Sequence, residues 1–270
     1  MSNSSPAVWQ RTAIALSMAT IALIGWQLTA TDIFRQLFPE AGDLSRYLTV
    51  KGLYAGFIIA IIGGFGLFAA TGFRGPVKPM SVLAGLPLIV LPVLTLMQVI
   101  NDSPPSFSMV MVGWILVALF VGVGEESVFR GLVYRAVEKT GLWPTALITS
   151  GLFGGAHLLG LVSDTPDSII LAQAVFAASV GLVLFAVRYV AGSIWTVVAL
   201  HTFFDAIAFI AAGDIANVLP SPEQAVPRLL AGSAIMLVWG VPALLVIQWR
   251  QGRNRSDRSN AVPAAASEPA

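Results

Sequence analysis

Eight long apolar runs divide this chain, and they constrain its fold more than any other feature. Each run has about the length that an α-helix needs to cross the ~30 Å hydrocarbon core of a bilayer. Several runs contain Gly or Pro, which membrane helices tolerate when neighbouring helices satisfy the freed backbone groups. The sequence therefore predicts an all-α, polytopic membrane bundle of about eight transmembrane helices. The runs cover approximately residues 12–30, 52–72, 81–100, 107–124, 142–162, 168–187, 193–213 and 229–249.

Composition supports an integral membrane protein. Hydrophobic residues make up 56% of the chain and charged residues only 11%, against about 25% charged residues in an ordinary soluble domain. The net charge of +1 and the lack of a basic stripe exclude nucleic acid as a partner. Because the chain has no cysteine, it has neither disulfides nor a thiolate site. The lipid bilayer is the expected partner.

The domain organisation and orientation follow from repeats and charges. No repeat or boundary appears, so residues 1–250 are expected to form a single transmembrane domain, with a catalytic core at about 107–213. Residues 251–270 are rich in Arg, Ser, Asn, Pro and Ala, and are expected to form a disordered cytoplasmic tail. Eight spans place 11 Lys and Arg on one side and four on the other. The positive-inside bias predicts cytoplasmic termini, in a bacterial inner membrane, with Glu125 near the cytoplasmic interface.

Two adjacent carboxylates, Glu125 and Glu126, follow the fourth apolar run. A charged side chain in hydrocarbon costs roughly 2.5–3.5 kcal/mol on insertion scales, so such a pair needs a reason. On a helix, Glu126 and Arg130 are four residues apart and share a face, which favours an ion pair. Glu125 projects about 100° away and has no local partner. We therefore expect Arg130 to hold Glu126, and Glu125 to be free for chemistry.

The two histidines of the chain both lie within predicted spans. His157 is in the fifth run, and His201 is in the seventh, four residues before Asp205. Ionisable groups within membranes turn towards the bundle interior and mark functional sites. We therefore expect Glu125, His157 and His201 to converge on one cavity, with Asp205 facing the same space.

Phe153 and three glycines, at 151, 154 and 155, precede His157 on its helix. Small residues allow two helices to approach closely, which would bring the imidazole against a neighbouring helix. For Phe153, plain packing and a role beside the site both remain open at this point.

A glutamate, two histidines and an aspartate in a dry bundle point to hydrolysis. A desolvated carboxylate is a competent general base for water, and a histidine can share that water or supply a proton to a leaving amine. Glu125, His157 and His201 also make up a known type of zinc ligand set with an open position for water. The cofactor is therefore zinc or none, and neither mechanism needs a serine or cysteine nucleophile.

Three short motifs on separate late spans resemble those of the CAAX prenyl protease and bacteriocin-processing (CPBP, or Abi) family of intramembrane endopeptidases. The resemblance covers about residues 110–210. The motifs are Glu125-Glu126-x-x-x-Arg130, Phe153-x-x-x-His157 and His201-x-x-x-Asp205.

The resemblance implies a role for each motif. Glu125 and His157 would activate the attacking water, while His201 and the residue four positions later would stabilise the oxyanion. Glu126 and Arg130 would shape and hold the first motif. The implied substrate is a membrane-associated, or membrane-proximal, protein or peptide, with CAAX-type prenylated proteins as the class that the family name suggests.

Asp205 departs from the eukaryotic prenyl protease pattern, which resembles this motif but ends in Asn. An ionised Asp accepts hydrogen bonds and cannot donate one to an oxyanion. Asp205 must therefore be protonated, orient His201 or serve a metal.

Two alternatives come from other functional classes. A proton-coupled transporter also uses buried Glu, His and Asp, but inverted repeats and paired broken helices are not evident. A non-catalytic membrane protein, acting in bacteriocin self-immunity or as a scaffold, could carry the same motifs. The favoured hypothesis is an endopeptidase of the CAAX-protease type.

Overall fold

The computed structural model describes residues 6–102, 108–213, 218 and 221–260, and all regular structure within these ranges is helical. Within these described ranges, seven helices are long and apolar enough to cross a membrane, and an eighth span results if η1 and α3, which are bent by 72°, are counted together. The predicted all-α bundle of about eight spans is confirmed. The elements are α1 (Pro6–Leu37), α2 (Asp43–Gly64), η1 (Pro79–Gly85), α3 (Pro87–Asp102), α4 (Met109–Glu126), η2 (Ser127–Val133), α5 (Tyr134–Val137), η3 (Glu138–Thr140), α6 (Leu142–His157), η4 (Leu158–Val162), α7 (Asp167–Ala191), α8 (Ile194–Ala212) and α9 (Pro222–Asn260).

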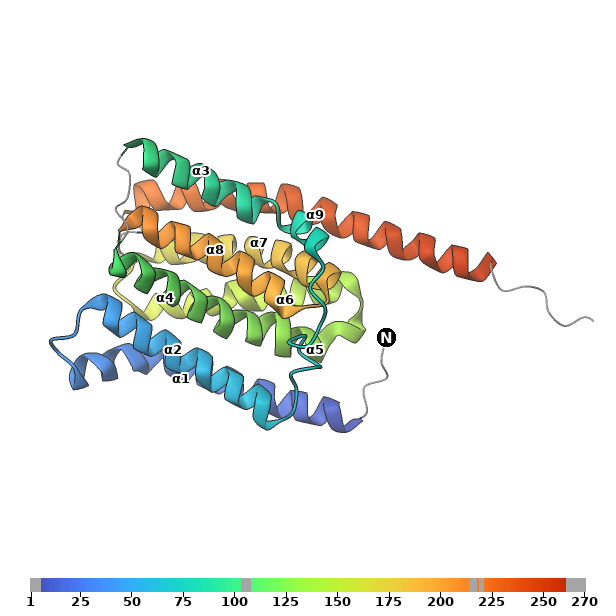
Figure 1. Cartoon of the computed structure of the whole chain (residues 1–270), viewed down its shortest axis with the longest axis horizontal. Coiled ribbons are helices and arrows are strands. Elements are labelled where there is room, and N and C mark those ends of the chain that lie inside the picture. Colours follow the sequence, from blue (N-terminus) through green and yellow to red (C-terminus); the bar gives the residue numbers. More distant parts are fainter. Residues whose placement is uncertain (1–5, 103–107, 214–217, 219–220, 261–270) are drawn as a thin grey trace, which may run out of the picture.

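The long helices lie side by side, with α7 as the central helix (Figure 1). α7 packs against α6, α8 and α9, while α4 packs between α2 and α8. The α1–α2 hairpin forms one edge of the bundle and α3 lies near the other edge with α9 (Figure 1). In the apolar 18-residue stretch of α7, 67% of the residues are buried inside the protein. Such a helix, apolar all round, is typical of a bundle interior.

The apolar pattern predicts that the fourth span ends at residue 124, but the structure shows that it does not. It continues from α4 through η2, α5 and η3 as a 32-residue run from Met109 to Thr140. The stretch η2 is a π-helix whose residues are all buried; such π-helical turns are frequent at functional sites. The two glutamates thus lie near the middle of this run rather than at its end. The helix can continue because Glu126 is paired within the bundle.

The second span also differs from the prediction, because α2 ends at Gly64 and not at residue 72. Gly66 and Gly72 adopt positive φ angles of 65° and 93°, which only glycine adopts at little cost. The backbone carbonyl of Gly72 then accepts a hydrogen bond from the N–H of Ile194 at 3.1 Å. This turn therefore docks against the first residue of α8.

The predicted disordered tail is wrong for residues 251–260, which continue α9 (Figure 1). The guanidinium of Arg253 lies 4.9 Å from the ring centroid of Trp249, one helical turn earlier. Gln251 donates a hydrogen bond to the hydroxyl of Tyr189 on α7. These contacts support the helix beyond the apolar run. The rest of the predicted tail, residues 261–270, lies outside the described residues.

Two of the 11 cations that set the predicted orientation, Arg130 and Arg188, are buried within helices rather than in loops. The remaining nine still exceed the four on the opposite side. Cytoplasmic termini therefore stay the prediction of the positive-inside bias.

The close helix approach expected at the glycines before His157 occurs at one of them. A Cβ atom at Gly154 would lie 2.5 Å from the carbonyl oxygen of Ala174 and 2.7 Å from the Cβ of Ala178, both on α7. At Gly151 and Gly155 a Cβ would meet nothing within 4 Å. Gly154 is therefore the contact that sets the distance between α6 and α7.

We expect Gly154→Ala to lower the stability of the protein and Gly155→Ala to leave it unchanged or raise it. Overpacking a tight contact costs about 1–3 kcal/mol, whereas replacing an unhindered helical glycine by alanine gains up to about 1 kcal/mol. Thermal unfolding of both variants in detergent gives the comparison. Equal melting temperatures would contradict this description of the α6–α7 contact.

Candidate functional site

Glu126, at the end of α4, lies at the centre of the buried charges. Its Oε1 accepts a hydrogen bond from Nη1 of Arg130 at 3.1 Å and one from Nδ1 of His201, on α8, at 2.7 Å. The side chains of Glu126 and Arg130 are fully buried. The predicted ion pair is therefore present, but sequence reasoning missed the contact with His201. One carboxylate oxygen joins the first and third motifs.

Arg130 lies in the π-helix η2, and three different groups hold its guanidinium. Besides Glu126, its Nη2 donates to the carbonyl of Gly181 on α7 at 3.1 Å. Its guanidinium carbon lies 4.4 Å from the centroid of the Phe153 ring, a cation–π arrangement. A Cβ at Gly181 would lie 3.2 Å from Nη2, so glycine there leaves room for the guanidinium. Arg130 thus ties α4, α6 and α7 together around the site.

His201 has a carboxylate beside each ring nitrogen. Nδ1 meets Glu126, and Nε2 lies 3.3 Å from Oδ2 of Asp205 and 3.9 Å from Oε2 of Glu125. Both ring nitrogens of His201 therefore lie within reach of a carboxylate oxygen. The sequence left three roles open for Asp205. Its contact with Nε2 of His201 fits the role of orienting that imidazole.

Glu125 lies in a different environment from Glu126, as the helix geometry predicts. Its side chain is 16% exposed, whereas that of Glu126 is 0% exposed. It lines a narrow cavity of about 10 Å³ between α1, α2 and α4, which is about the space that one water molecule needs. Glu125 therefore has access to a water-sized space that Glu126 lacks. The other lining residues are Leu23, Trp26, Gln27, Lys51, Tyr54 and Val121.

His157 ends α6 and reaches the cluster through Phe153. Its Nδ1 lies 2.9 Å from the carbonyl oxygen of Phe153, and because a carbonyl oxygen only accepts, this nitrogen donates. The Phe153 ring packs edge-on against both imidazoles, with centroid distances of 5.2 Å to His157 and 5.9 Å to His201. In the described ranges, no hydrogen bond or ion pair joins His157 to Glu125. Phe153 is therefore both a packing residue and the connection between the histidines.

The arrangement of the candidate ligands decides whether they fit a zinc ion. Among the residues that the structure describes, no group of three or more His, Cys, Asp or Glu side chains is arranged to hold a metal ion. Glu125, His157 and His201 do not fit a three-ligand zinc site in this arrangement.

Arg188, which sequence reasoning assigned to a loop, is a further buried residue beside the site. It is 5% exposed, and its Nε donates to the backbone carbonyl of Arg130 at 3.1 Å. Its Nη2 donates to the carbonyl of Thr71 at 3.3 Å, and its guanidinium lies over the ring of Tyr134. Arg188 thus anchors the π-helix to the turn after α2. A charge one residue beyond an apolar run was the available signal.

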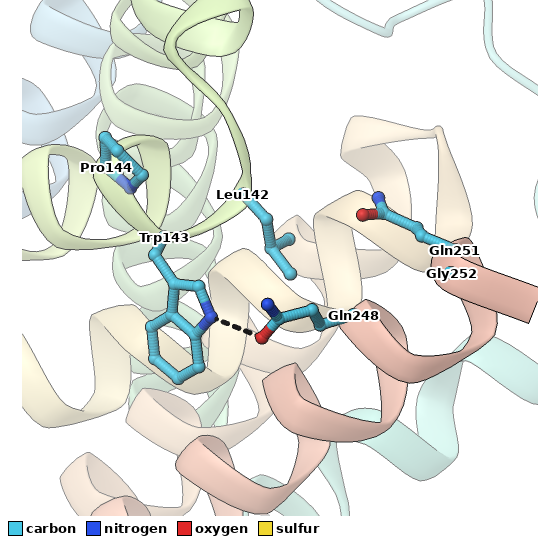
Figure 2. A pocket seen from close by; sticks show the side chains of 6 residues that line it. All are labelled: Leu142, Trp143, Pro144, Gln248, Gln251 and Gly252. Atoms are coloured by element: carbon cyan, nitrogen blue, oxygen red, sulfur yellow. Dashed lines mark hydrogen bonds between the residues drawn. The ribbon is translucent and has the colours of Figure 1, made fainter. Parts of the chain in front are cut away.

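A roomier pocket lies away from these residues, between the start of α6 and the end of α9 (Figure 2). Its volume is about 350 Å³, and Nε1 of Trp143 donates to the side-chain oxygen of Gln248 across it at 2.8 Å. No carboxylate or histidine is among its six lining residues. Of the site residues predicted from the sequence, Glu125 lines the smaller cavity instead.

Comparisons with known proteins agree with the three motifs. Residues 107–207 match the family model described as Type II CAAX prenyl endopeptidase Rce1-like. The matched segment contains all seven residues of the motifs. It begins just before α4 and ends within α8, two residues after Asp205. The comparison with curated proteins gave no match. Over residues 107–207, this chain is thus similar to the CAAX prenyl endopeptidases, in agreement with the CPBP family that its motifs predict.

Proposed function

We propose that this protein is an intramembrane endopeptidase that hydrolyses a peptide bond in a membrane-associated protein. The observation that carries the proposal is the position of Glu125, a carboxylate beside a water-sized cavity and 3.9 Å from His201. The family match supports a CAAX-type endopeptidase in general. Prenylated CAAX proteins are accordingly the substrate class that we propose.

In the proposed reaction, Glu125 accepts a proton from a water molecule as the water oxygen attacks the scissile carbonyl carbon. The resulting tetrahedral intermediate collapses when its C–N bond breaks, and the proton on Glu125 passes to the leaving amine. A carboxylate in a largely dry site is suited to this transfer in both directions. The resemblance of the motifs gives His157, at the end of α6, the support of the same water, although His157 is not among the residues that line the cavity at Glu125.

His201 and its neighbours position the base rather than take up the proton. Asp205 and Glu126 fix the ring of His201 through its two nitrogens. Arg130 in turn fixes Glu126. Since these charged groups are mutually paired, and Glu126, Arg130 and His201 among them are buried, the site can keep its geometry when a peptide displaces water.

Hydrolysis of a lipid-modified peptide tests the proposal. The purified protein in liposomes is expected to cleave a fluorogenic farnesylated CAAX peptide between the modified cysteine and the next residue. The matched control is the same peptide with serine in place of the farnesylated cysteine, which we expect to be cleaved more slowly. Mass spectrometry identifies the products. If neither peptide nor a pool of membrane-anchored peptides is cleaved, the proposed function is wrong and a non-catalytic role gains support.

A further inference from the structure

Tyr54 on α2 has a buried hydroxyl without a protein partner. The residue is 5% exposed, and its hydroxyl makes no hydrogen bond within the described part of the chain. Buried side-chain polar groups nearly always have a partner, so an exception of this kind needs an explanation. A phenol is both a donor and an acceptor. Its missing partner can therefore be a water molecule or a substrate atom.

The position of Tyr54 relates this hydroxyl to Glu125. Both residues line the narrow cavity between α1, α2 and α4. A Cβ at Gly124 would lie 2.9 Å from Cδ1 and Cε1 of Tyr54, so the glycine next to Glu125 in sequence lets the phenol ring pack directly on α4. The ring is thereby fixed beside the proposed base, in the lining of the same cavity.

Among the motif residues, no free hydrogen-bond donor remains for the oxyanion. Of the residues that line the cavity at Glu125, Gln27 and Lys51 carry donors, and Tyr54 is the one with a buried hydroxyl that has no partner in the described structure. An ionised Asp205 accepts hydrogen bonds only, and both nitrogens of His201 face carboxylates. Nδ1 of His157 is used by the carbonyl of Phe153. A hydrolytic site needs a donor aimed at the oxygen where negative charge develops. The uncommitted hydroxyl of Tyr54 meets this requirement.

We propose that Tyr54 is a further catalytic residue, whose hydroxyl donates a hydrogen bond to the scissile carbonyl oxygen as it becomes the oxyanion. The phenol keeps its proton throughout, so the balance of the reaction is unchanged. This inference rests on the proposed endopeptidase function. α2 lies outside residues 107–207, so the family match assigns no role to this residue.

Tyr54→Phe removes the hydroxyl and keeps the ring that packs on Gly124. We expect kcat for the farnesylated peptide to fall by about 10²–10³-fold, as for the loss of one oxyanion donor, with KM nearly unchanged. The melting temperature should stay at the wild-type value or rise. The matched control is Tyr47→Phe, two turns earlier on α2, where the ring packs on Trp114. This control should keep wild-type kcat.

A second measurement separates a catalytic from a structural role. A peptide aldehyde, whose hydrate resembles the tetrahedral intermediate, should lose affinity for Tyr54→Phe, whereas the corresponding peptide alcohol should not. Equal loss for both inhibitors, or wild-type kcat in Tyr54→Phe, would overturn the inference and leave the endopeptidase function standing. Absence of cleavage by the wild-type protein would overturn the function and the inference together.

Discussion

Glu125→Gln is expected to lower kcat by at least about 10²–10⁴-fold, the range typical of losing a general base, while the protein stays folded. Glutamine keeps the size and packing of the side chain, but it cannot accept the proton of the attacking water. Little stability depends on the charge of Glu125. Its nearest ion-pair partner in the described structure, Nε2 of His201, lies at 3.9 Å, and its side chain reaches the cavity.

A second glutamate of the same helical run provides the control for this variant. Glu138 lies in η3 and pairs with Arg135, away from the cavity. Glu138→Gln should therefore keep wild-type kcat and KM. Rates at saturating peptide, measured for both variants in the same liposomes, separate a loss of chemistry from a general effect of removing a carboxylate. Wild-type kcat in Glu125→Gln would contradict its assignment as the base.

Glu126→Gln is expected to lower the stability of the protein as well as its activity. Breaking a fully buried ion pair by removing one charge costs about 3–5 kcal/mol, because the remaining charge stays buried without compensation. Here the same oxygen also accepts from His201, so the imidazole loses one of the groups that fix it. Arg130→Ala should resemble Glu126→Gln more than Glu125→Gln, since both leave half of the pair. Thermal unfolding and peptide hydrolysis, measured on each variant, give the two readouts.

The double variant Glu126→Gln/Arg130→Ala is the critical control for the buried pair. Because it leaves no unpaired charge of this pair, its loss of stability should be smaller than the sum of the two single losses. The pair of Arg135 and Glu138, which is partly exposed, provides a comparison in which losing one charge should cost little stability. Arg135→Gln should cost at most about 1 kcal/mol. Strictly additive losses at Glu126 and Arg130 would show that the pair is not coupled as described.

Local spacing predicted the parts of the site that lie within one helix. Glu126 and Arg130, and likewise His201 and Asp205, are four residues apart, and both pairs are in contact. The 3.6-residue period decides such contacts without knowledge of the fold. The difference in environment between Glu125 and Glu126 follows from the same geometry.

Contacts between helices could not be predicted, because the sequence does not fix how each helix is rotated about its axis. The hydrogen bond from His201 to Glu126 joins residues 75 positions apart. Tyr54 and Arg188 belong to α2 and α7, where nothing in the local pattern distinguishes them from packing or loop residues. Their proximity to the site depends on Gly124 and Gly72, whose missing Cβ atoms leave space for these side chains.

The ends of the spans were predicted poorly for a related reason. Hydropathy treats a charge as the end of a membrane helix, but Glu126 and Arg130 neutralise each other inside the bundle and the helix continues. The polar composition of residues 251–260 predicted a disordered tail, although local contacts of Arg253 and Gln251 support helix there. Neither the π-helix η2 nor the bend before α3 has a signal in the apolar pattern.

The central claim is that the two neighbouring glutamates have different roles, Glu125 in chemistry and Glu126 in holding the site. The most direct test measures peptide hydrolysis and melting temperature together for the wild-type protein, Glu125→Gln and Glu126→Gln. We predict a wild-type melting temperature with lost activity for Glu125→Gln, and a lowered melting temperature with lost activity for Glu126→Gln. Full activity in Glu125→Gln, together with an inactive Glu126→Gln that melts like the wild-type protein, would show that the two roles are reversed.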